Sequence, residues 1–123
     1  MMKRFGLWLP PLIYMALIFH FSSESDPLPE VTHHMWDKLL HMVEYGGLGL
    51  LFCRALSGEG LRWIRAVVVA IVLTSIYGAT DEGHQSFVPQ RTADVRDWFA
   101  DNLGATLGAG SYAIAMVGRR ERR

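Results

Sequence analysis

The stretch Trp63–Asn102, WIRAVVVAIVLTSIYGATDEGHQSFVPQRTADVRDWFADN, decides the fold class. Its first part, residues 63–80, is apolar apart from Arg65 and is close to the roughly 20 residues that a helix needs to cross a bilayer. Its second part crowds charged side chains in front of another apolar run. Charged groups are costly inside hydrocarbon and usually mark function where they occur there. The alternation therefore predicts membrane-spanning helices with a polar site at one end.

The sequence contains four apolar segments. They cover approximately residues 5–21, 39–56, 63–80 and 98–117. Backbone polar groups in lipid must be hydrogen-bonded within the protein, so each segment is expected to be a helix. The prediction is an all-α fold, a four-helix transmembrane bundle that forms a single domain over residues 1–123. The first segment is also compatible with a signal peptide, because a basic start, an apolar run and small residues follow one another.

Charge segregation gives the expected orientation. The chain has 12 basic and 12 acidic residues and no net charge, so no overall field favours nucleic acid as a partner. Most basic residues flank the segments on one side, which by the positive-inside rule places both termini in the cytoplasm. These residues are Lys3, Arg4, Arg54, Arg62, Arg65, Arg119, Arg120, Arg122 and Arg123.

The opposite, external side collects polar residues at helical spacing. Asp37, His41, Glu44 and Tyr45 recur three and four residues apart and share one face of the second segment. Two further clusters lie directly after the third segment and around the start of the fourth. Four-helix bundles build sites from such facing clusters, so a polar external cavity is expected. A buried network that only fixes the helix register is the alternative interpretation. The further clusters are Asp81, Glu82, His84 and Gln85, and Asp94, Asp97, Asp101 and Asn102.

Small residues predict close helix packing below these clusters. Gly104 and Gly108 form a small-xxx-small pair with Ala105 and Ala109 beside it, and GGLG at residues 46–49 is expected to act in the same way on the second helix. The single cysteine, Cys53, excludes an intrachain disulfide and a metal cluster of the paired-cysteine type.

The motifs together resemble a known family. DK..H..EY at residues 37–45, DE.HQ.F.P.R at 81–91 and D...N.G, which begins at Asp97, are similar to the VanZ-like family, and FSS after the first segment also fits it. The resemblance implies a small multi-pass protein of the bacterial inner membrane. The founding member of the family is associated with teicoplanin resistance, but the resemblance implies no defined reaction. The residues that carry over are Asp37, Lys38, His41, Tyr45, Asp81, Glu82, Gln85, Arg91, Asp97 and Asn102.

These residues suggest four functions. The first is modification of an envelope lipid or lipid-linked cell-wall precursor, with catalytic groups and ligand-binding groups at the external side. The second is binding or transport of the same ligand without chemistry, and the third is a structural role. The catalytic candidates are His41, Asp81, Glu82, Asp37 and Tyr45, and the ligand-binding candidates are Lys38, Gln85, Arg91, Asp97 and Asn102.

The fourth possibility is metal dependence. Imidazole and carboxylate groups are suitable ligands, but no HExxH or paired-cysteine spacing supports a metal, so no metal ligand is assigned from the sequence. The sequence identifies no cofactor and no oligomeric state. The ligand types considered are those of His41, Glu44, Asp81, Glu82 and His84.

Overall fold

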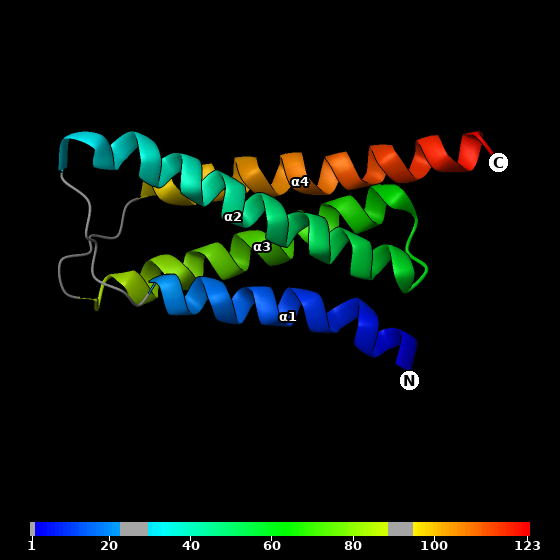
Figure 1. Ribbon diagram of the computed structural model, residues 1–123, viewed down its shortest axis with the longest axis horizontal. Coiled ribbons are helices and arrows are strands. Elements are labelled where there is room, and N and C mark those ends of the chain that lie inside the picture. The colour runs from blue at the N-terminus through cyan, green and yellow to red at the C-terminus, as the bar shows by residue number, and fades with distance from the viewer. Residues whose placement is uncertain (1, 23–29, 89–94) are drawn as a thin grey trace.

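The computed structural model describes residues 2–22, 30–88 and 95–123, of which residues 2 and 30–37 are described by their backbone only. These residues form four α-helices and no strand, which confirms the predicted all-α class. The helices lie side by side along the long axis of the molecule (Figure 1). They are α1 (Met2–Ser22), α2 (Glu30–Gly58), α3 (Trp63–Gln85) and α4 (Val95–Glu121).

Every helix is longer than the apolar segment that predicted it. The α2 helix begins at Glu30, α3 continues to Gln85 and α4 begins at Val95. Hydropathy falls where charged residues begin, but the hydrogen bonds of the helix backbone do not depend on side-chain polarity. The extra turns therefore carry the charged clusters on regular helix. The Pro10–Pro11 pair lies inside α1, which continues through it as one helix.

The α2 and α4 helices form the most extensive contact of the bundle, and α3 packs against both. Glycine residues allow the backbones of α2 and α4 to approach each other closely. A Cβ atom on Gly104 would collide with the backbone carbonyl of Met42, and one on Gly108 with that of Gly46. A Cβ on Gly49 would lie 2.7 Å from the carbonyl oxygen of Ala105. The predicted small-residue contact between these segments is confirmed.

The first helix is peripheral. It packs against α2 and, less extensively, against α3, and within the described residues it makes no contact with α4. Tyr77 of α3 donates a hydrogen bond to the carbonyl of Met15 at 2.6 Å, which fastens α1 to the rest of the bundle. The polar end of the bundle is therefore built by α2, α3 and α4.

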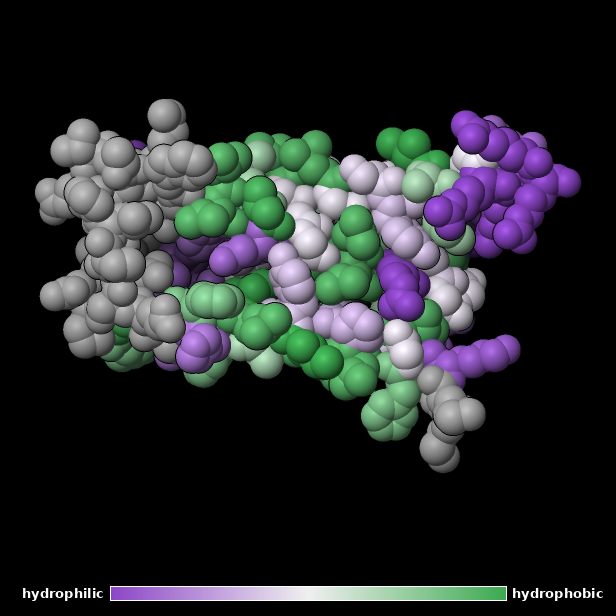
Figure 2. All heavy atoms as spheres, in the orientation of Figure 1, coloured by the Kyte–Doolittle hydropathy of each residue, from purple (hydrophilic) through white to green (hydrophobic). Residues whose placement is uncertain are grey.

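The surface between the two ends is apolar. Large hydrophobic side chains such as Leu12, Val68 and Leu107 are about half exposed. Figure 2 shows hydrophobic residues, interspersed with residues of intermediate hydropathy and a few hydrophilic ones, over the middle of the visible face, and a strongly hydrophilic group at the end with the C-terminus. Three helical stretches are long and apolar enough to cross a membrane, namely Lys3–Ser22, Lys38–Gly58 and Trp63–Gln85. The α4 helix does not reach that apolarity, because it is rich in glycine and polar residues.

Both termini lie at the same end of the bundle as the turn between α2 and α3 (Figure 1). Gly60 in this turn has φ of 98°, a left-handed conformation that glycine adopts at little cost. Glu59 beside it accepts a hydrogen bond from Trp8 Nε1 at 3.1 Å and pairs with Arg4 at 3.2 Å. These contacts join the start of α1 to the end of α2.

Candidate polar site at one end of the bundle

Polar side chains from three helices meet inside the bundle at the end opposite the termini. All are at most 8% exposed, although most could ionise in water. The middle of α2, the end of α3 and the start of α4 bring them together because the three helices alternate in direction. We call this group the polar core: His41, Tyr45, Asp81, Glu82, Gln85, Asp97 and Asp101.

Two contacts join α2 to α4 across the polar core. His41 Nδ1 lies 2.7 Å from Asp101 Oδ1, and both side chains are almost wholly buried. One turn earlier on both helices, Lys38 Nζ donates to Asp97 Oδ1 at 3.4 Å. Lys38 stands at the rim, with 32% of its side chain exposed. Lys38 and His41 are three residues apart on α2, and Asp97 and Asp101 are four apart on α4, so each helix presents one face and the two faces meet.

Tyr45 joins α2 to α3. Its hydroxyl donates to Asp81 Oδ2 at 2.7 Å, and the ring is fully buried. The ring is nearly parallel to that of His41, with an interplanar angle of 2° and centroids 6.0 Å apart. A substitution at Tyr45 would therefore disturb both the carboxylate of α3 and the imidazole of α2.

The polar core has an excess of acidic groups. Four buried carboxyl groups, those of Asp81, Glu82, Asp97 and Asp101, face a lysine at the rim and a histidine that is cationic only when protonated. Within the described part of the chain, Asp81 Oδ1 and Asp101 Oδ2 accept no hydrogen bond. Buried charges and unbonded polar atoms are costly, so this group needs compensation from protons, a cation, a ligand or residues outside the described ranges.

Not every candidate residue belongs to the polar core. Asn102 is half-buried, and its side chain donates to the carbonyl of Trp98 in its own helix at 2.9 Å. His84 stacks on Phe19 of α1 at 4.5 Å between ring centroids. Arg91 and the side chain of Asp37 lie outside the described residues.

One member of the polar core was missing from the predicted site residues. Asp101 is fully buried and contacts His41 at 2.7 Å, whereas the sequence placed it only in the polar cluster near the fourth segment. The signal was present, because Asp97 and Asp101 are four residues apart and share a helix face.

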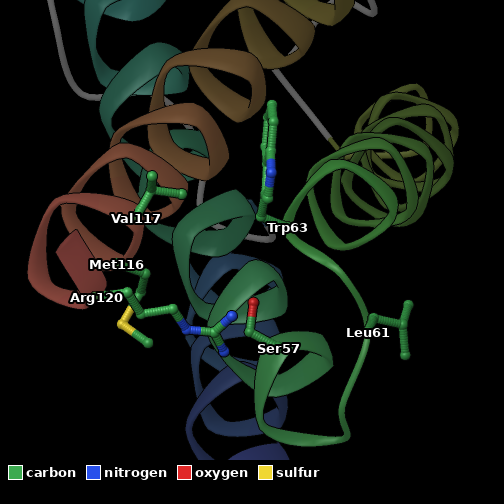
Figure 3. Close-up of a pocket in the computed structure, with 6 residues that line it drawn as sticks. All are labelled: Ser57, Leu61, Trp63, Met116, Val117 and Arg120. Carbon is green, nitrogen blue, oxygen red and sulfur yellow. The ribbon is translucent and has the colours of Figure 1, made fainter.

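A pocket at the other end of the bundle has a different character. It is lined by apolar side chains with two polar groups, Ser57 and Arg120 (Figure 3). It lies between the end of α2, the start of α3 and the end of α4, far along the helices from the polar core. The remaining lining residues are Leu61, Trp63, Met116 and Val117.

One protein-family model matches nearly the whole chain. The model of the VanZ/LLP1 family matches residues 5–116, a range that contains every residue of the polar core. The chain belongs to the VanZ/LLP1 family. This confirms the expected VanZ-like membership, and together with the three apolar helices it identifies a membrane protein. No curated protein and no solved structure matches the chain.

Proposed function

We propose that this VanZ/LLP1-family protein binds the headgroup of an envelope lipid or lipid-linked cell-wall precursor at the polar end of its bundle and modifies it by acid–base chemistry. The observation that carries the proposal is the buried His41–Asp101 pair beside the Tyr45–Asp81 pair. An imidazole fixed by a carboxylate is a common general acid or base, and one in a membrane-embedded bundle would act on a membrane-bound substrate.

The proposed setting is the bacterial inner membrane, with both termini in the cytoplasm and the polar core toward the external side. The basic residues near the termini and near the α2–α3 turn support this orientation through the positive-inside rule. We also propose that α4 spans the bilayer. Its 27 residues pack along α2 and α3, and both termini lie at one end of the bundle, which supports four crossings.

Each group would have a defined role in this reaction. His41 would move a proton at Nε2 while Asp101 holds its Nδ1, and Tyr45 and Asp81 would form a second proton-transfer pair. Lys38 and Arg91 would hold a phosphate or carboxylate of the headgroup, Arg91 through paired hydrogen bonds. Asp37, Glu82, Gln85, Asp97 and Asn102 remain proposed site residues.

Two alternatives use the same residues. In the first, the protein binds or carries the lipid without changing it. In the second, the polar core only locks the bundle, which the cross-helix hydrogen bonds favour. A link to teicoplanin resistance would follow from the first proposal if the bound lipid is the cell-wall precursor that glycopeptides recognise.

The test is mass spectrometry of the purified protein mixed with polyprenyl phosphates, lipid-linked cell-wall precursors and phospholipids. Wild type is compared with His41→Ala and Arg91→Ala, and His84→Ala serves as the matched histidine control. We expect a new product with wild type and His84→Ala and none with the other two variants. A retained but unchanged lipid that is lost only in Arg91→Ala would mean a binder, and no retained lipid would favour the structural role.

A further inference from the structure

We infer that the polar core binds a divalent metal ion through His41, Glu82 and Asp97. This inference deepens the proposed function, since the ion would face the same headgroup, but its test needs no lipid. The three residues come one from each of α2, α3 and α4, and all three are buried. Of the ligands considered from the sequence, only His41 and Glu82 belong to this group.

The distances fit one ion. One ligand atom from each side chain lies within 4.8 Å of the other two. In a tetrahedral site, two ligand atoms that each stand about 2.1 Å from the ion are about 3.4 Å apart, so the most distant pair needs to close by at most about 1.4 Å. One imidazole nitrogen and two carboxylate oxygens suit zinc or manganese better than calcium, which prefers oxygen ligands alone.

The His41–Asp101 pair prepares the imidazole for a metal. When Nδ1 donates its proton to Asp101 Oδ1, at 2.7 Å, the nitrogen that remains to bind an ion is Nε2. Metal-binding histidines almost always donate their other N–H to a carboxylate or carbonyl in this way. Asp101 would therefore orient the ligand and raise its basicity without touching the ion.

The charge of the polar core provides a second, independent argument. Asp81 Oδ1 and Asp101 Oδ2 are buried carboxylate oxygens that accept no hydrogen bond within the described residues. Asp101 is bonded to His41 and Asp81 to Tyr45, whose ring is parallel to that of His41, so both carboxyl groups belong to the contact network of the inferred ligand His41. A divalent cation would offset two of the four negative charges. The contact of Lys38 Nζ with Asp97 Oδ1 is long, at 3.4 Å, and an ion could replace it.

Three protein ligands leave at least one coordination position open. Catalytic metal sites have this form, whereas structural zinc sites are closed by four protein ligands. The open position would take water or an oxygen of an anionic headgroup. This connects the ion to the proposed function while leaving the ion itself testable in the absence of lipid.

The experiment titrates the full chain, purified in detergent and stripped with EDTA, with ZnCl2 and with MnCl2 in a calorimeter. We expect one ion per chain for wild type, and a loss of affinity of about 100-fold or more in Glu82→Gln and in Asp97→Asn. Asp101→Asn should lose about 10–100-fold, the range typical of residues that orient a ligand. Glu44→Gln, a half-buried glutamate one turn from His41, is the matched control and should bind like wild type.

Lys38→Met keeps the test decisive if the loss variants fail to fold. Removal of the competing ammonium group should tighten metal binding several-fold, which damage to the fold would not do. A wild type that binds neither ion stoichiometrically would overturn the inference, and so would equal affinities of Glu82→Gln and Glu44→Gln. Metal binding without any lipid binding would overturn only the proposed function, and lipid binding without metal would overturn only this inference.

Discussion

The two ends of the bundle differ in how far their charged pairs are exposed to solvent. At the end with the termini, Arg4 and Glu59 pair at 3.2 Å, but the Arg4 side chain is 76% exposed. At the other end, His41 and Asp101 approach to 2.7 Å with side chains 5% and 0% exposed. Exposed pairs contribute at most about 1 kcal/mol, whereas removal of one partner from a buried pair costs about 3–5 kcal/mol.

This difference in exposure indicates different roles for the two sets of charged residues. Exposed basic groups can orient a helix bundle in a membrane without any exact partner. Buried acids and an imidazole need defined partners on three helices. Their desolvation costs free energy of folding, so stability alone is a poor reason to keep them buried. The buried end is therefore where a function should be sought, and variants of each end can test the contrast.

The largest effect should come from Gly104→Val, which attacks the approach of α2 and α4 beside the polar core. Its side chain would collide with the backbone carbonyl of Met42, next to His41, so the helices must separate. We expect loss of the folded protein, measured by fluorescence-detected size exclusion. The matched control is Gly110→Val on the same helix, where an added Cβ meets nothing within 4 Å. Equal yields of both variants would contradict the close α2–α4 contact.

An intermediate effect is expected from Asp101→Ala. The change leaves His41 buried without its carboxylate and should lower the free energy of unfolding by about 3 kcal/mol or more. Thermal unfolding in detergent would measure it. The double variant with His41→Ala should lose less than the sum of the two single variants, because no orphaned group remains. Additive losses would mean that the two residues do not interact.

The smallest effect should come from the exposed end. Arg4→Ala removes a pair that is mostly in solvent, so we expect a change in unfolding free energy of less than about 1 kcal/mol. A double-mutant cycle of Arg4→Ala and Glu59→Ala should give a coupling free energy well below that between His41 and Asp101. A coupling as large as the buried one would remove the contrast between the two ends.

The sequence predicts the helices better than it predicts the site. Apolar runs reveal four helices, but they end where charges begin, so they do not show that α3 continues through Asp81 and Glu82. Helical spacing places Asp97 and Asp101 on one face. It does not reveal which neighbour that face meets, since this depends on how α4 is rotated against α2.

The contrast between Asp101 and Asn102 shows the same limit. The two residues are adjacent, yet a helix turns about 100° between them. Asp101 consequently points to His41, while Asn102 bonds back to Trp98 of its own helix. The sequence alone does not tell which of these two neighbours belongs to the polar core, because this depends on how α4 packs against α2 at the glycine contact.

The order of the helices along the chain has a consequence for biosynthesis. The α4 helix comes after the other three, is not apolar enough to qualify as a span by itself, and supplies Asp97 and Asp101. During insertion, until α4 has packed against α2, His41 and Lys38 therefore lack the carboxylates that they contact in the folded protein. Assembly of this protein should depend on α2 and α3 recruiting their last partner, and a chain that stalls before α4 should be a substrate for membrane quality control.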